Sequence, residues 1–185
     1  MTTRTACSAS LVALHEECVA ILRGDYDSAI IGGANLIMTP GATMSMTEQN
    51  VFLKDGFCTI FLADANGYAH GEAIAVVYII RLDDALRDGN PIRAVIRGTA
   101  TNHNSKIPGM AVPGAKVQEA LMRRAYKVAS ITNFSKTGFM ECHGAGTPLA
   151  ILLKPVQSDG SSENQASTLG LSFPIWDTED ASGVL

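Results

Sequence analysis

The chain has 185 residues, of which 46% are hydrophobic and 17% charged, a composition typical of a globular domain with a sizeable core and not of a disordered or fibrous protein. Its 14 basic and 18 acidic residues give a net charge of −4, and the absence of any run of lysines or arginines argues against nucleic acid as a partner. No stretch approaches the roughly 18 apolar residues of a membrane span and the first residues lack the pattern of a signal peptide, so we expect a cytoplasmic protein that does not enter a membrane.

The first predicted element is a helix that follows Cys7 and ends at Gly24, which stands where a C-terminal cap belongs. Its apolar face is formed by Leu11, Leu14, Cys18 and Ile21. Cys7 then lies at the helix start, where unpaired backbone N–H groups and the helix dipole favour a thiolate. A small packing residue is the plainer interpretation of a lone cysteine, and the spacing leaves both interpretations open.

Three segments are predicted as strands. Residues 28–33 form a short apolar run closed by glycines, typical of a strand buried on both faces. Residues 73–80 are a second continuous apolar run, and residues 92–97 alternate like a strand with one wetter face. We expect the last two to be neighbours in one sheet, joined by a short helix or turn at 82–89. The pattern indicates a layered α/β fold.

The second half begins with a segment rich in Asn, Gly and Pro at 100–114, which predicts a loop. Residues 116–129 carry apolar residues at helical spacing, and residues 139–142 are predicted to be a strand that delivers a histidine to a Gly-rich turn. Beyond residue 154, serines stand among Asp, Gly, Asn and Gln without a period, so we expect the segment 151–185 to be poorly ordered.

His143 is a candidate partner for the cysteine, because the Gly-Ala-Gly that follows it lets a ligand approach closely. A structural role is an equal alternative. Leu149 stands where a dinucleotide-binding loop needs a small residue, which disfavours nucleotide binding, and cysteines without paired spacing predict neither a metal site nor disulfides. The other histidines are expected to be structural or solvated: His15 at the core edge, His70 and His103 in loops.

Six segments occur together in one order. They are Thr-Ala-Cys-Ser-Ala-Ser-Leu-Val-Ala-Leu-His at 5–15, Ala-Ile-Ile-Gly-Gly-Ala-Asn-Leu at 29–36, Asn-Gly-Tyr-Ala-His-Gly-Glu at 66–72, Asp-Asp-Ala-Leu-Arg-Asp-Gly at 83–89, Pro-Ile-Arg-Ala-Val-Ile-Arg-Gly-Thr at 91–99 and His-Gly-Ala-Gly-Thr-Pro at 143–148. This set resembles the β-ketoacyl synthase family over residues 4–149. Within that family it is most similar to the ketosynthases of iterative, fungal-type polyketide synthases.

The resemblance implies a thiolase-like layered αβαβα fold, here incomplete, with a partial ketosynthase domain at 1–150 and an unmatched segment at 151–185. It implies that Cys7 accepts an acyl chain from the phosphopantetheine of an acyl carrier protein, and that His143 is one of two histidines that assist decarboxylation of a malonyl thioester. Decarboxylative Claisen condensation follows. Substrate contacts would come from Gly144, Gly146 and Thr147. The family acts as a homodimer and binds no cofactor or metal directly.

Several positions depart from the family pattern. The second catalytic histidine and its lysine are not found, and residues 150–154 replace the expected Gly-Asp-Pro-Ile-Glu. We therefore expect that the chain alone does not form carbon–carbon bonds and that residues 73–80 lack cover. The alternatives are an inactive remnant with at most a dimerisation role and, less favoured, a cysteine hydrolase. Single substitutions relative to the family are Arg4, Leu62, His70, Ala73 and Ala145.

Overall fold

The computed structural model describes residues 1–48, 52, 68–103, 115–138, 140, 141, 143 and 172–177. Its elements, in chain order, are η1 (Ala6–Ser8), α1 (Ala9–Arg23), β1 (Ser28–Asn35), α2 (Pro40–Glu48), β2 (Ala73–Ile80), α3 (Leu82–Arg87), β3 (Val95–Thr101), α4 (Ala115–Val128), η2 (Phe134–Lys136) and β4 (Ser172–Asp177). The described helices include none long and apolar enough to cross a membrane.

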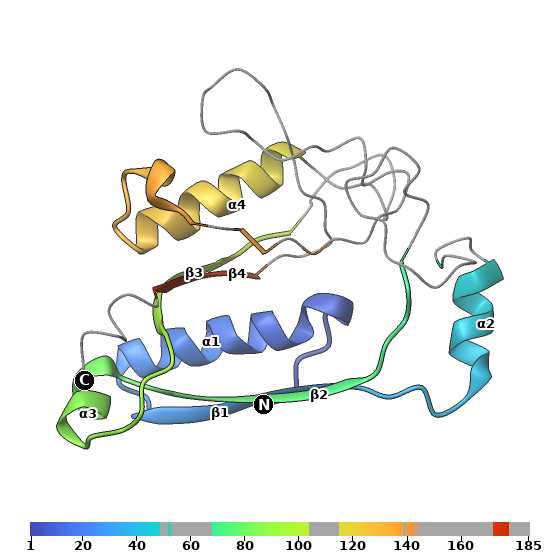
Figure 1. The fold of residues 1–185 in the computed structure, drawn as a ribbon, viewed down its shortest axis with the longest axis horizontal. Helices are drawn as coiled ribbons and strands as arrows, with labels where there is room; N and C mark the ends of the chain where they lie inside the picture. Colours follow the sequence, from blue (N-terminus) through green and yellow to red (C-terminus); the bar gives the residue numbers. More distant parts are fainter. Residues whose placement is uncertain are drawn as a thin grey trace.

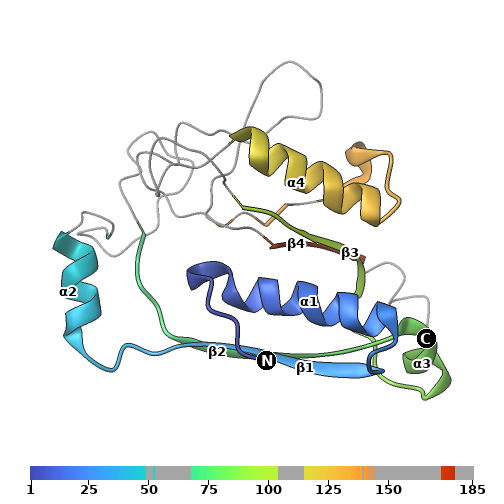
Figure 2. The same ribbon diagram turned by 180° about the vertical axis from the view of Figure 1, so that it is seen from behind.

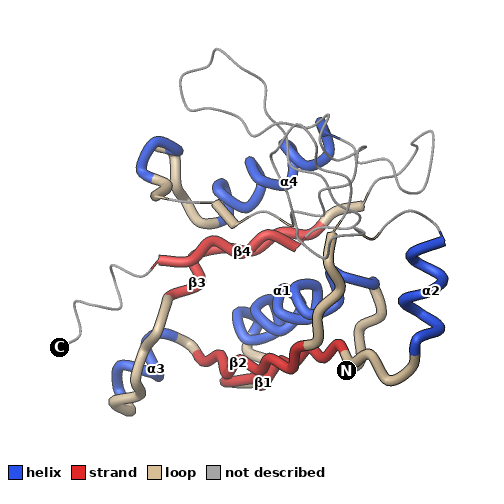
Figure 3. Tube along the Cα trace, turned by 45° about the vertical axis from the view of Figure 1, so that its right-hand side comes forward, coloured by secondary structure: helices blue, strands red, loops and turns tan. Residues whose placement is uncertain are grey.

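The elements stack in layers (Figure 1). The β1–β2 sheet lies on one side of α1, the β3–β4 sheet lies on the other side, and α4 covers the far face of β3–β4. The view from behind shows the same order (Figure 2), and the turned view shows α1 between the two pairs of strands (Figure 3). Helix α2 stands apart from these layers at one end of the molecule.

Helix α1 confirms the first prediction from the sequence. Leu14 and Ile21 are buried on the predicted apolar face, and Gly24 closes the helix with a φ of 81° that a residue with a side chain adopts at a cost. The Gly24 N–H donates to the carbonyls of Ala20 and Ile21, so the last turn is capped. Helix α1 therefore packs its buried residues between the two sheets.

Strands β1 and β2 pair antiparallel, from Ser28 opposite Ile80 to Asn35 opposite Ala73. Ile31 is buried, and β1 contacts α1. The opposite face is open to solvent, with Ile30 74% and Ile74 70% exposed. The expectation that residues 28–33 are buried on both faces is therefore wrong, since α1 covers one face only. The expectation that residues 73–80 lack cover is confirmed.

The predicted pairing of segments 73–80 and 92–97 is wrong. Strand β2 pairs with β1, and β3 pairs with β4, in a different sheet. The chain leaves β2 through α3 and passes α1 before β3 begins, so α1 separates the two strands. Strand β3 runs from Val95 to Thr101, whereas the strand was predicted at residues 92–97. Its last residues lie in the segment 100–114, which was predicted to be a loop.

Two other expectations need correction. Within the segment 151–185, for which poor order was predicted, residues 172–177 form β4 and pair with β3. Met140 and Glu141 are not in a strand, because they lie outside any ladder of the described residues, so the predicted strand at 139–142 is not found there. The rest of these two segments, and residues 104–114 of the predicted loop, lie outside the described residues.

The core under α4 is small and close-packed. Ala100 of β3 and Leu121 and Ala125 of α4 form a cluster in which no member is more than 1% exposed. Small residues let helix and sheet approach closely, and Leu121 fills the space between them. The predicted helices at 82–89 and 116–129 are confirmed as α3 and α4. Helix α2 was not predicted, although Pro40 at its first position is a typical helix start.

Candidate active site

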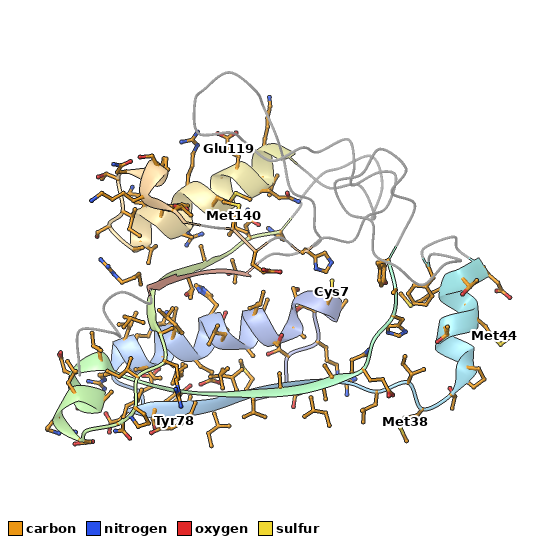
Figure 4. All side chains as sticks on the ribbon, viewed as in Figure 1. Cys7, Met38, Met44, Tyr78, Glu119 and Met140 are labelled. Carbon is orange, nitrogen blue, oxygen red and sulfur yellow. The ribbon has the colours of Figure 1, made fainter. Side chains whose placement is uncertain are left out.

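Cys7 lies in the short helix η1, directly before α1 (Figure 4). The residue before it, Ala6, has a φ of 53°, in the left-handed region that residues with a side chain rarely adopt. Cys7 is exposed, whereas the next residue, Ser8, is only 4% exposed. The predicted position of the cysteine at a helix start is confirmed, and the tight turn presents its thiol to solvent.

Strand β1 approaches the first turn of α1 closely at Gly33. A Cβ placed on Gly33 would lie 3.0 Å from the Cβ of Ser10, closer than ordinary van der Waals contact. Glycine at this position therefore lets the Cys7 end of α1 lie directly on the sheet. A larger residue would push away the turn that carries the thiol.

An aromatic group is formed by Phe52 and by the segment 68–70, which carries Tyr68 and His70. The rings of Phe52 and Tyr68 meet edge to face with centroids 5.1 Å apart, and Phe52 stacks on His70 at 5.0 Å. Burial, with a smaller electrostatic effect of Cys7, raises the pKa of the Tyr68 hydroxyl above its ordinary value.

Hydrogen bonds between the end of β1 and the segment before β2 hold the aromatic group. The Asn35 amide nitrogen lies 3.2 Å from the His70 Nε2 and donates to the Gly71 carbonyl at 2.5 Å. The backbone N–H of Ile37 donates to the Glu72 carboxylate at 2.5 Å. His70 lies in a loop, as expected, and is only partly exposed, because its ring stacks on Phe52 and its Nε2 contacts Asn35.

The sequence patterns mark neither Tyr68 nor Phe52 as a member of an aromatic group. Tyr68 lies inside the Asn-Gly-Tyr motif, which carried the family resemblance, but a motif does not show which side chains its members contact. Phe52 stands in a stretch without a defined period, so no local signal marks it. The position of His70 and Gly71 depends on the β1–β2 pairing, which brings them against Asn35.

His143, the predicted partner of Cys7, belongs to the described residues. Solvent reaches part of the residue, yet desolvation by the surrounding protein lowers the pKa of the ring below that of an ordinary histidine. Within the part of the chain that is described, neither side chain has a hydrogen bond, so the pairing of Cys7 with His143 stays a prediction. Gly144, Gly146 and Thr147 lie outside the described residues.

The remaining histidines and cysteines are placed as follows. His15 is half-buried, and its Nδ1 lies 2.7 Å from the Thr99 hydroxyl of β3, which agrees with a core-edge role. His103 is exposed, as predicted. Burial, and then Glu17, raises the pKa of the Cys18 thiol to about 11, so this thiol stays protonated and unreactive. No cluster of metal-ligating side chains occurs among the residues that the structure describes.

Two family models match this chain: the β-ketoacyl synthase N-terminal domain over residues 1–85 and the β-ketoacyl synthase C-terminal domain over residues 93–150. The chain belongs to the β-ketoacyl synthase family. Both models together include Cys7 and His143, the two residues that the motifs assigned to catalysis. The ketosynthase match is the one expected from the resemblance.

Related ketosynthase sequences come from fungal enzymes. A highly reducing polyketide synthase of Aspergillus fumigatus is 57% identical over 148 residues, which is 80% of this chain and 6% of that synthase. One from Byssochlamys spectabilis is 57% identical over 144 residues, covering 78% of this chain and 7% of that protein. One from Glarea lozoyensis is 45% identical over 185 residues, 99% of this chain and 7% of its own length, so that alignment continues into the segment 151–185.

Solved ketosynthases have the same fold. The ketosynthase from module 6 of the bacillaene synthase of Bacillus subtilis aligns with a TM-score of 0.75 and 37% identity, over 78% of this chain and 26% of that one. The oxazolomycin ketosynthase of Streptomyces albus gives a TM-score of 0.75 at 34% identity, also over 78% of this chain and 26% of that one. The β-ketoacyl synthase fragment described here therefore has part of the thiolase-like fold, and it spans a small share of the synthases it matches.

Proposed function

We propose that this ketosynthase segment takes part in the decarboxylative Claisen condensation of a polyketide synthase, with Cys7 as the residue that carries the growing acyl chain. The observation that carries the proposal is the exposed Cys7 in a tight turn at the start of α1, within a chain that matches both ketosynthase domain models. The comparisons give no support to the alternative of an inactive remnant.

The first step of the proposed reaction is thioester exchange. The Cys7 sulfur attacks the acyl carbonyl of a thioester on the phosphopantetheine of an acyl carrier protein. The carbonyl becomes a tetrahedral oxyanion, and we propose that the backbone N–H of Cys7 stabilises it. The bond from the carbonyl carbon to the pantetheine sulfur then breaks, and that sulfur leaves as a thiol with the proton that Cys7 has lost.

The second step forms the carbon–carbon bond. A malonyl thioester loses carbon dioxide, and the electron pair left on its α-carbon attacks the acyl-Cys7 carbonyl while the cysteine sulfur leaves and regains a proton. We propose that His143 donates a hydrogen bond to the thioester oxygen of the malonyl group. Its lowered pKa supports this role, since a neutral imidazole carries an N–H donor without the charge of a cation. Gly144, Gly146 and Thr147 are proposed substrate contacts.

Thioester exchange is the step to test first. Purified chain is incubated with an acyl carrier-protein thioester and the intact mass is followed over time. One acyl group should be added, and Cys7→Ala should abolish the addition. Cys18→Ala is the matched control, because it removes a half-buried thiol from α1, the helix that follows the Cys7 turn, and should leave acylation unchanged. Acylation that persists in Cys7→Ala would overturn the assignment.

The partners of the chain are also proposals. An acyl carrier protein is the proposed source of the acyl and malonyl thioesters, and no further cofactor is required for the chemistry. A homodimer and a cytoplasmic location rest on the family resemblance and on the lack of a disulfide pattern among the cysteines. We keep residues 1–150 as the proposed extent of the ketosynthase domain. Sedimentation of the purified chain tests the dimer.

A further inference from the structure

A single buried hydroxyl closes the turn that carries Cys7. The Ser8 Oγ donates to the Thr5 carbonyl at 2.8 Å and lies 3.0 Å from the Thr5 hydroxyl. The backbone N–H of Ser8 donates to the same Thr5 carbonyl at 3.3 Å. These three contacts join the residues on either side of Ala6 and Cys7, so they fix the loop of chain that presents the thiol.

The turn needs such a constraint because it includes an unfavourable backbone conformation. Ala6 has a φ of 53°, where its Cβ crowds the following carbonyl, and such residues persist only where neighbouring contacts hold them. The Ala6 carbonyl accepts a bond from the Ala9 N–H, which ties the turn to the start of α1. Without the Ser8 contacts, Ala6 is free to relax to a negative φ, and the direction of the Cys7 side chain changes.

The Ser8 side chain has no other partner among the described residues that would explain its burial. It is 4% exposed, it lies next to an exposed thiol, and both of its hydrogen bonds go back to Thr5. Since a buried hydroxyl without a partner is costly, the Thr5 contacts are what allow a serine to stand here. The hydroxyl therefore serves the shape of the turn and not contact with solvent.

We propose that Ser8, through Thr5, is a positioning residue for the nucleophile: it holds the left-handed turn at Ala6 so that the Cys7 sulfur points into the acylation site. The inference rests on the proposed acylation of Cys7. Ser8 itself does not meet the acyl group. Its effect is on how often the thiol has the reactive orientation, so it should change the maximal rate of acylation and leave the affinity for the thioester unchanged.

The test uses the whole 185-residue chain and four variants: Ser8→Ala, Thr5→Val, Thr5→Ser and Ser10→Ala. Thr5→Val keeps the carbonyl and the shape but removes the hydroxyl contact, and Thr5→Ser restores the hydroxyl. Ser10→Ala is the matched control, since it removes an exposed hydroxyl from the same end of α1 and keeps the Cβ that meets β1. Acylation by the carrier-protein thioester is measured against thioester concentration.

Ser8→Ala should lower the maximal acylation rate by about tenfold with an unchanged half-saturating concentration, the order expected when a hydrogen bond that orients a reacting group is lost. Thr5→Val should lower it roughly threefold, while Thr5→Ser and Ser10→Ala stay within about twofold of the parent chain. Equal rates in Ser8→Ala and the parent chain, or a loss in Thr5→Ser as large as in Thr5→Val, would overturn the proposal.

Alkylation of Cys7 by iodoacetamide across a range of pH separates this proposal from the proposed function. Alkylation needs the exposed thiol but no acyl thioester, so slower labelling of Cys7 in Ser8→Ala at every pH, with the same pH midpoint, supports the positioning role even if the thioester does not acylate the parent chain. An unchanged rate, or a shifted midpoint that alone explains the loss, counts against it. Cys18 reports on the fold in the same experiment, because it stays unlabelled while α1 is packed. A Ser8→Ala chain that labels Cys18 quickly has lost its fold, and Thr5→Val then decides the outcome.

Discussion

Gly98 lies where β3 meets α4 most closely, and Gly98→Ala should destabilise the protein. A Cβ at this position would stand 2.8 Å from the Ala129 nitrogen and 3.0 Å from the Ala125 carbonyl oxygen. These two atoms are the partners of one hydrogen bond at the end of α4, 2.9 Å long, and Ala125 is fully buried. Neither atom belongs to a flexible side chain, so the helix as a whole has to move away from the sheet.

The expected cost follows from this geometry. Relieving a contact at 2.8 Å requires α4 to recede by roughly half an ångström, and overpacking of this kind costs about 3 kcal/mol when backbone has to shift. Replacing glycine also restricts the unfolded chain, which offsets up to about 1 kcal/mol. The net loss of about 2 kcal/mol should lower the melting temperature of a chain of this size by about 4 to 8 °C.

Thermal unfolding can be followed through the single tryptophan, Trp176, which belongs to β4 and stands opposite Ile96 of β3. Gly138→Ala is the matched control, because no atom lies within 4 Å of the Cβ it would add. Gly138→Ala should change the melting temperature by less than about 2 °C. If Gly98→Ala melts at the same temperature as the control, the close approach of β3 and α4 is not what limits this position.

Three further predictions concern protonation, thiol reactivity and solubility. Burial lowers the pKa of His15 in the folded protein, so the unfolded chain binds the proton more readily. The free energy of unfolding should therefore be highest above pH 6.5 and fall below it, and the fall should be less steep in His15→Gln. If urea titrations at several pH values give the same dependence of the unfolding free energy on pH for both chains, this prediction is contradicted. Iodoacetamide should label exposed Cys7 well before Cys18, whose pKa is about 11, and peptide mass spectrometry showing the reverse order would refute the assignment of Cys7 as the reactive thiol. Ile74→Lys and Val76→Lys, on the open face of β2, should reduce aggregation measured by light scattering, and unchanged scattering would show that this face does not drive association.

The apolar patterns in the sequence predicted the separate elements well. Helix α1, strand β2 and helix α4 lie where the spacing of apolar residues put them, because the period of a helix or a buried strand is a local property of the chain. The family resemblance also came from local motifs, and both domain models confirm it. The start of α1 at Cys7 was equally visible, since small residues before an apolar period mark a helix start.

The arrangement of the strands was not available from these patterns. Strand β3 pairs with β4, which lies far along the chain in a segment without any period, and the expected pairing with β2 is excluded by α1 between the sheets. An apolar run predicts that a strand is buried, but not which helix or strand covers it. Ile30 and Ile31 are adjacent and chemically identical, yet only Ile31 is buried, because α1 covers one face of the sheet.

Some features of the candidate site could likewise be predicted from the sequence, and others could not. The sequence by itself was enough to propose Cys7 and His143 as the residues that carry the chemistry, because the motifs around them are contiguous in the chain. Only the tertiary structure brought the rings of Phe52 and Tyr68 together and showed that Ser8 closes the left-handed turn at Ala6. The physical reason is that strand pairing, burial and backbone φ depend on the contacts that a residue makes after folding. Those contacts are with residues elsewhere in the chain or within the folded turn, and a local sequence pattern does not include them.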